Sequence, residues 1–171
     1  METVLNRKPK TDASTVPEHE GKYLTFFLCG EEYGIAILKV KEIMGIMNIT
    51  PVPQAPGYVK GVINLRGKVI PIVDLRSKFG MPEKDHTQET CIIVVEVEKV
   101  LTGIIVDTVS EVIDINGSDI EPSPHFSNDV STDLFLGMAK VKDKVKILLD
   151  IDAVLGSNDI NLIKNLTHES V

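Results

Sequence analysis

The clearest hydrophobic pattern in the chain lies over residues 69–75, where Asp74 is the only polar residue. Successive side chains of a strand point to opposite faces, and here both faces carry apolar groups. The segment is therefore predicted to be a strand that is buried on both sides. Pro71 lacks an N–H to donate to a neighbouring strand, so one edge is expected to be unpaired at that point.

The four residues Asn64-Leu65-Arg66-Gly67 link this strand to the apolar run before it. Asn and Gly supply the backbone freedom that a tight hairpin needs. A hairpin here places the Arg66 guanidinium, which is planar and always charged, at the rim of the strand pair. Arg66 is therefore a candidate recognition residue, and the alternative is an ordinary solvated side chain.

Shorter elements precede this hairpin. The pattern predicts a strand over 23–28, a turn over 30–32 with a solvated Glu31-Glu32 tip, a partner strand over 33–37, a short helix or twisted segment over 38–44 and a strand over 44–49. Pro51, Pro53 and Pro56 exclude a regular ladder over the next residues. The polar segment 81–90 has the composition of a linker.

The second half of the chain repeats the first. Residues 34–44 align with 103–113 at an offset of 69, and residues 61–80 align with 137–156 at an offset of 76. Asp74 matches Asp150 in the second block. The seven-residue difference falls in the Pro-, Ser- and Asp-rich loop 121–133, as expected for an insertion. Two matched blocks in the same order indicate an internal duplication.

The repeat sets the predicted fold class. Each copy holds about five short Val- and Ile-rich strands with frequent turns, which is typical of a small barrel, so the chain is predicted to be all-β with two barrels. Barrels of this size bury little surface alone, and we expect them to share a core. The predicted boundaries are a disordered tail over 1–20, barrel one over 22–80, the linker 81–90, barrel two over 91–156 and a C-terminal helix and tail over 157–171.

Composition limits the classes of partner and the compartment that can be expected for the chain. The net charge of −7 argues against nucleic acid and against an anionic membrane surface as the main partner. No stretch approaches the roughly 20 apolar residues that span a bilayer, and the first 20 residues have no apolar core, so a cytoplasmic protein without a signal peptide is expected. Cys29 and Cys91 lie in apolar runs and are predicted to be buried free thiols.

No pattern in the chain indicates an active site, a metal site or a cofactor. The four histidines lack metal-ligand spacing, and no phosphate-binding or nucleophile motif is present. Asp74 and Asp150 could be pictured as a carboxylate pair. Their repeat-related positions instead favour a turn or cap hydrogen bond after each strand. The chain is therefore predicted not to be an enzyme.

One difference between the copies bears on Arg66. Residues 64–67 become Lys140-Val141-Lys142-Asp143 in the second copy, so the tight turn with its Arg is expected in the first copy alone. A duplication keeps in both copies what the fold requires. The difference at this turn therefore favours a functional role for Arg66.

Several motifs together resemble the CheW family of bacterial chemotaxis adaptors. They are F-x-x-x-G-E-E-Y-G-I over 26–35, Val40-x-Glu42-Ile43, Gly61 to Gly67 followed by Pro-Ile-Val-Asp-Leu over 71–75, and the segments 103–107 and 109–112 of the second copy. The resemblance covers roughly residues 22–156. It implies two SH3-like five-stranded β-barrels with short helical segments, and it implies no catalysis and no cofactor.

The resemblance also implies partners. CheW-like proteins couple transmembrane chemoreceptors to the CheA histidine kinase, binding the cytoplasmic tip of methyl-accepting receptors and the CheW-like regulatory domain of the kinase. Such a protein is recruited to receptor arrays through its partners and does not insert in the membrane. The receptor-binding residues that the family motifs imply, near a groove between the barrels, are Val40, Glu42, Gly61, Asn64, Arg66, Gly103 and Val112.

Alternatives stay open for these residues. Val40 could be core, and Glu42 could lie on a solvated helix face. Met44, Ile46 and Met47 form an adaptable apolar group that could face the kinase or pack in the core. For the whole chain, the alternative function is a small-molecule-binding or enzymatic double barrel with a site between its halves.

Overall fold

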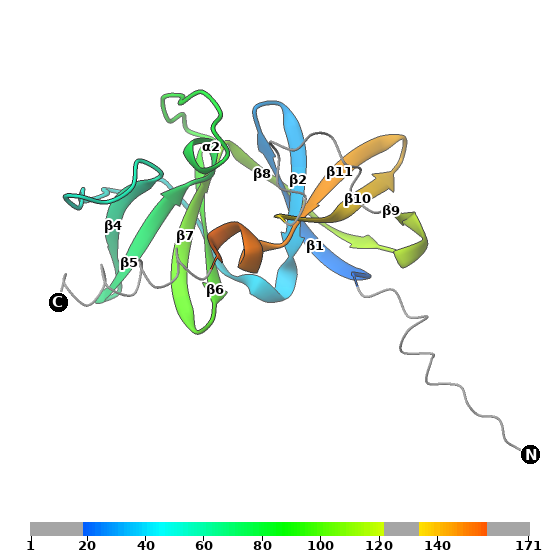
Figure 1. Cartoon of the computed structure of the whole chain (residues 1–171), viewed down its shortest axis with the longest axis horizontal. Coiled ribbons are helices and arrows are strands. Elements are labelled where there is room, and N and C mark those ends of the chain that lie inside the picture. The colour runs from blue at the N-terminus through cyan, green and yellow to red at the C-terminus, as the bar shows by residue number, and fades with distance from the viewer. Residues whose placement is uncertain (1–18, 122–133, 157–171) are drawn as a thin grey trace, which may run out of the picture.

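The computed structural model describes residues 19–121 and 134–156, which form two β-sheets lying side by side (Figure 1). The first half contributes β1 (Gly21–Leu28), β2 (Glu31–Ala36), the 3-10 turn η2 (Ile37–Lys39), β3 (Val40–Gly45), β4 (Val59–Leu65), β5 (Lys68–Asp74) and α2 (Leu75–Lys78). The second half contributes β6 (Cys91–Val97), β7 (Val100–Val106), β8 (Thr108–Ile115), η3 (Gly117–Asp119), β9 (Ile120–Glu121), β10 (Phe135–Val141), β11 (Lys144–Leu149) and a helical segment over 151–156. The predicted tail over 1–20 and the C-terminal segment over 157–171 lie almost wholly outside the described residues, as does the insertion loop.

The two sheets do not follow the predicted division of the chain. The six-stranded sheet has the order β8-β1-β2-β11-β10-β9, and the five-stranded sheet has the order β3-β6-β7-β5-β4. The assignment of residues 22–80 to one barrel and 91–156 to the other is therefore wrong. The segment 81–90 joins α2 to β6, and β6 enters the same sheet as β5.

The copies have exchanged their first hairpins. β2 of the first copy runs parallel to β11 of the second, and β7 of the second copy runs parallel to β5 of the first. The chain crosses between sheets at η2 and again at Asp107, between β7 and β8. Each sheet is thus completed by a hairpin from the other copy, a pairing that a repeat read along the sequence does not reveal.

Equivalent positions in the two copies make equivalent contacts. The backbone N–H of Asp74 donates to the carbonyl oxygen of Tyr58 at 2.8 Å, and that of Asp150 donates to Leu134 at 2.9 Å. The Asp74 carboxylate accepts from the N–H of Arg76 at 3.0 Å, and that of Asp150 accepts from Asp152 at 3.1 Å. The predicted cap hydrogen bonds are confirmed for both aspartates, and the duplication holds in three dimensions.

Three groups of buried side chains make the core. The largest lies between the sheets and takes residues from both of them, among them Phe26, Val73, Ile93 and Leu149. A second group, which includes Ile70 and Ile72, lies on the other face of the five-stranded sheet, and a third lies within the six-stranded sheet. β5 is thus buried on both faces as predicted, and its parallel pairing with β7 begins at Ile72, directly after Pro71. The all-β fold class and the shared core are confirmed.

Four hairpins turn tightly, including the one expected to lack a tight turn. Their two-residue turns, each with positive φ at both positions, are Cys29-Gly30, Arg66-Gly67, Glu98-Lys99 and Lys142-Asp143. Positive φ at both central residues is what a type I′ turn requires, and that turn matches the twist of the flanking strands. The expectation that the second copy lacks the tight turn is therefore wrong, and the copies differ there only in side chains.

Three other local predictions are corrected. Cys29 is exposed because it is the first residue of a turn and not part of the strand, and Cys91, at the start of β6, is partly buried. Glu32 lies inside β2 and is buried instead of solvated. The segment 38–44, expected as a short helix or twisted segment, and the strand expected over 44–49 are instead η2 followed by β3, whose exposure alternates over 40–45 with the period of a strand.

The buried Glu32 is neutralised by a lysine of the other copy. Lys146 of β11 places its Nζ 2.7 Å from Glu32 Oε1, and their side chains are only 5% and 9% exposed. The equivalent positions in the five-stranded sheet are the apolar Ile70 and Leu101. A buried charge needs a partner, so this pair helps to specify the exchange of β2 into the six-stranded sheet.

The effect of an unsatisfied buried hydroxyl on stability can be tested at Thr102. Thr102 is fully buried, and its Oγ1 has no hydrogen-bond partner among the described residues. Thr102→Val removes that unsatisfied group without changing the shape, so we expect the free energy of unfolding to rise by about 1 kcal/mol in urea denaturation. Thr25→Val is the matched control, because the Thr25 hydroxyl bonds the backbone of Glu111 at 3.1 and 3.2 Å. It should lower stability, and equal effects of the two variants would contradict this assignment.

Candidate functional site

Arg66 stands at the rim of the five-stranded sheet on a turn that holds its backbone firmly. Its φ of 50° is followed by a φ of 86° at Gly67. The Asn64 side-chain oxygen accepts the N–H of Gly67 at 2.9 Å, so Asn64 stabilises the turn itself. The side chain of Arg66 is 70% exposed, and the sequence-based placement at the rim is confirmed.

Glu42 of β3 pairs with this arginine in a two-point contact. Arg66 Nη2 lies 2.5 Å from Oε1 of Glu42, and Nη1 lies 3.3 Å from Oε2. The hydrogen bond from Arg66 holds the pKa of the Glu42 carboxyl below its usual value and raises the pKa of the guanidinium. Glu42 lies on the strand β3 and not on a helix. Its charge is held beside that of Arg66 by the ion pair.

The pair joins two edges of one sheet. β3 and β4 lie at opposite ends of the strand order. Glu42 of β3 contacts Arg66 of the turn that follows β4, and Thr50, in the segment after β3, forms a bridge with Val62 of β4. Opposite charges on a rigid rim can orient an incoming polar partner.

Gly61 and Gly103 lie in the interior and contribute space instead of contacts. Gly61 has a φ of 144°, and a Cβ there would meet the carbonyl oxygen of Thr50. At Gly103 a Cβ would lie 2.6 Å from Ile72 Cδ1 and 2.8 Å from Ile92 Cγ2. Both glycines let neighbouring strands approach, so neither presents a surface to a partner.

Apolar residues beside the pair divide between core and surface. Val40 is partly buried and packs against the core between the sheets. Val112 of β8, on the six-stranded sheet, is 51% exposed. Its equivalent in the first copy is Ile43, which is 44% exposed and which was expected in a short helix or twisted segment. The repeat alignment, in which Ile43 and Val112 occupy equivalent positions, is the signal that could have identified Ile43 as an exposed strand residue.

The methionine group is also divided. Met44 and Ile46 pack against the second buried group, the one that includes Ile70 and Ile72, whereas Met47 is 38% exposed. Leu38 of η2, which was likewise expected in a short helix or twisted segment, is 87% exposed. Met47 alone of the three residues suggested for the kinase presents a large apolar surface.

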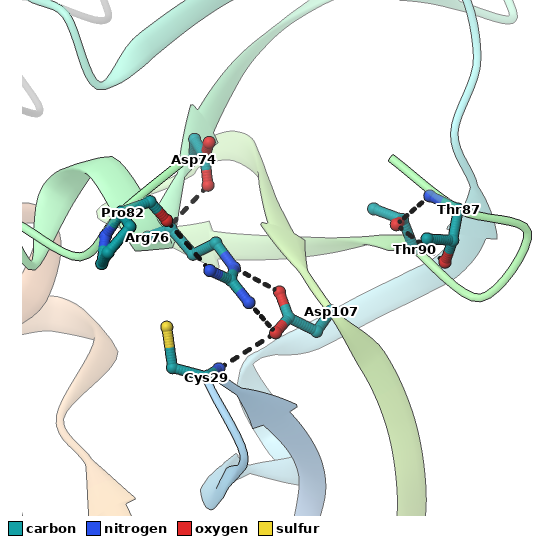
Figure 2. A network of polar contacts seen from close by, with 7 residues as sticks. All are labelled: Cys29, Asp74, Arg76, Pro82, Thr87, Thr90 and Asp107. Atoms are coloured by element: carbon teal, nitrogen blue, oxygen red, sulfur yellow. Dashed lines mark hydrogen bonds and ion pairs between the residues drawn. The ribbon is translucent and has the colours of Figure 1, made fainter. Parts of the chain in front are cut away.

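A second polar cluster lies where the chain crosses between the sheets (Figure 2). Arg76 of α2 binds Asp107 through Nε to Oδ1 at 2.7 Å and Nη2 to Oδ2 at 2.6 Å. Asp107 Oδ2 also accepts the backbone N–H of Cys29 at 3.0 Å. The hydrogen bond from Arg76 holds the pKa of Asp107 below its usual value. This cluster was not found from the sequence, because its members come from three segments far apart in the chain.

Two small pockets adjoin this cluster. The first, of about 170 Å³, is lined by Arg76, Asp107 and polar residues of the segment 84–90, and the second, of about 300 Å³, shares Asp74 with it. Within residues 19–121 and 134–156 no group of three His, Cys, Asp or Glu side chains could hold a metal ion. In the same residues no helix is long and apolar enough to cross a membrane.

Comparison with known proteins finds one family throughout. The model of the CheW-like domain matches residues 22–159. The chain is 38% identical to a chemotaxis protein CheW of Klebsiella aerogenes over 145 residues, which are 85% of this chain and 87% of that protein. It is 36% identical to a chemotaxis protein CheW of Bacillus subtilis over 137 residues, 78% and 86% of the two chains.

A solved structure shares the fold. The scaffolding protein TtCheW of Thermoanaerobacter tengcongensis superposes with a TM-score of 0.75 at 36% identity, over 82% of this chain and 95% of that one. The motifs that carried the resemblance lie within the matched residues. The recognition made from the sequence is confirmed.

The depressed pKa of Asp107 predicts a pH effect. A carboxyl with a lower pKa in the folded state adds stability that is complete above its unfolded pKa, near 3.9, and that is lost as the pH falls through the folded value. Asp107→Asn should therefore be less stable than the wild type at pH 7, and the difference should shrink as the pH falls below about 4. Urea denaturation from pH 7 to pH 2.5 measures it.

Asp114→Asn is the control for that series, because Asp114 pairs with Lys22 at 2.9 Å on an exposed surface. It should change stability little at any pH. A difference between wild type and Asp107→Asn that stays constant over the whole pH range would contradict a charge effect at Asp107.

Proposed function

Because the chain belongs to the CheW-like domain family, we propose that it is a non-catalytic adaptor that couples chemoreceptors to the CheA histidine kinase. The observation that carries the proposal is the match over residues 22–159, which covers nearly all of the described fold with its N-L-R-G hairpin. The protein would act on the cytoplasmic side of receptor arrays and would reach them through its partners.

The receptor tip binds, in this proposal, at the rim formed by Arg66 and Glu42. A helical partner needs apolar contacts and charges that set its register. Arg66 and Glu42 supply the charges, and the partly buried Val40 and the exposed Val112 supply apolar contacts. Asn64 fixes the turn that carries Arg66, and Gly61 and Gly103 allow the close strand packing behind it.

The kinase regulatory domain binds at a separate place, around Met47. Met47 is exposed two residues after β3 ends, and its sequence neighbours Met44 and Ile46 pack against the buried cluster that includes Ile70 and Ile72. A flexible thioether suits an apolar contact with a second β-domain. The proposal therefore assigns both partners to the five-stranded sheet, with Val112 as the contribution of the six-stranded one.

The alternative of a small-molecule or enzymatic site is less well supported. It requires an enclosed site between the halves, and ligand sites commonly measure about 300–1,000 Å³ with mostly apolar walls. The pockets near the crossing are about 170 and 300 Å³ and are lined mainly by charged and polar side chains. Arg76 and Asp107, which line the first, already bind each other.

Binding of the two partners tests the proposal directly. The purified chain should retain a chemoreceptor cytoplasmic-tip fragment and, separately, the regulatory domain of CheA, both from the same genome, at micromolar concentrations. Met47→Glu should weaken retention of the kinase domain and leave the receptor fragment bound. Retention of neither partner by the folded wild type would contradict the adaptor function.

Charge reversal at the turn tests the receptor surface. Arg66→Glu places a carboxylate beside Glu42, so we expect the affinity for the receptor-tip fragment to fall by about tenfold or more in a calorimetric titration. The fold should persist because the turn is exposed, which circular dichroism will show.

Lys142→Glu is the matched control for Arg66→Glu. Lys142 occupies the same position of the equivalent turn, with the same φ of 50°, on the other sheet. It makes the same change of charge, and it should alter receptor affinity by less than about twofold. Equal losses in both variants would show a general charge effect and would remove Arg66 from the binding surface.

A further inference from the structure

Arg76 ties three separate parts of the fold together, and none of them belongs to the partner surfaces proposed above. Its guanidinium binds Asp107 at two points and donates from Nη1 to the carbonyl oxygen of Pro82 at 2.9 Å. Asp107 passes the connection to the β1–β2 turn by accepting from Cys29, as Figure 2 shows. The five-stranded sheet, through α2, is thereby attached to a turn of the six-stranded sheet.

The same place in the other copy carries a weaker link. Asp152, the equivalent of Arg76, pairs with Lys39, which follows Leu38, the equivalent of Asp107. The Lys39–Asp152 pair has a single contact of 2.9 Å, and its side chains are 38% and 49% exposed. The side chains of Arg76 and Asp107 are 12% and 22% exposed. A two-point guanidinium–carboxylate contact in a shielded place constrains geometry far more than a solvated lysine pair.

The packing between the sheets is one contribution to their orientation, because the interdigitated apolar side chains of that core resist displacement. The hydrogen bonds of a fork-shaped guanidinium add a directional constraint. The contacts of Asp107 supply this constraint at the point where the chain passes from β7 into β8.

The position of Val112 depends on how the chain passes from β7 into β8. β8 begins at Thr108, directly after Asp107, and Val112 lies four residues further along the same strand. The backbone N–H of Asp107 also donates to the carbonyl oxygen of Phe27 at 3.0 Å, which places the start of β8 beside β1. The Arg66–Glu42 pair lies on the other sheet, so the distance between the two parts of the receptor surface follows the orientation of the sheets.

We propose that Arg76 is a positioning residue for receptor binding: by holding Asp107, it places the Val112 strand relative to the Arg66–Glu42 rim. The inference rests on the proposed function, because it concerns the same receptor surface. Arg76 does not contact the receptor itself.

The test combines affinity with sheet orientation in the full chain. Arg76→Ala should bind the chemoreceptor-tip fragment about tenfold more weakly, within the range usual for coupling between sites. Residual dipolar couplings of backbone amides should show the two sheets each intact but at a changed mutual angle. Arg76→Lys keeps the charge without the fork and should give an intermediate result.

Lys39→Ala is the matched control at the other crossing and should leave both affinity and orientation within error of the wild type. If Arg76→Ala does not fold, Asp107→Asn replaces it, because it keeps the shape and weakens the contact. A folded variant with unchanged affinity, or with reduced affinity and unchanged sheet orientation, would overturn the inference. If the wild type itself fails to bind the receptor fragment, the proposed function fails and this inference falls with it, whatever the couplings show.

Discussion

The structure depends on one constraint: each copy of the duplicated unit gives its first hairpin to the sheet of the other copy. Each sheet takes strands from both copies, because β2 pairs with β11 and β7 pairs with β5 as parallel neighbours. The exchange also forces the two sheets against each other, and the largest apolar core lies between them. Two small barrels that would be marginal alone thereby share their stability.

Within this exchanged frame the copies have come to differ in specific places. The turn with Arg66 is matched in backbone by the turn with Lys142, so the backbone belongs to the fold and the guanidinium is an addition. Inside the sheets, the Glu32–Lys146 pair of the six-stranded sheet stands where the five-stranded sheet has the apolar Leu101 and Ile70. The five-stranded sheet has an apolar interior and a charged rim, which is the arrangement expected of a docking surface.

The sequence predicted local features better than long-range ones. The two buried faces of β5, the Asp74 cap and the Arg66 turn depend on neighbouring residues, and all three are as expected. The hairpins were predicted correctly, but the assignment of strands to the two barrels was wrong, because a duplicated sequence has the same pattern whether a hairpin joins its own copy or the other. Glu32 misled for the same reason, since the lysine that neutralises it comes from β11. Among the candidate residues, Arg66 and Glu42 meet as expected, whereas Gly103, which the resemblance placed on the receptor surface, is interior, as the apolar run over 100–106 around it indicates.

We propose that an exposed rim on the five-stranded sheet, completed by β8, receives the receptor, and that the surface around Met47 receives the kinase domain. Backbone amide shifts measured with a chemoreceptor-tip fragment, and then with the CheA regulatory domain, test it most directly. The account predicts receptor-induced shifts at residues 40–43, at the turn 64–67 and around Val112, and kinase-induced shifts around Met47. Shifts from both partners confined to the segment 84–90 and its pockets would contradict it.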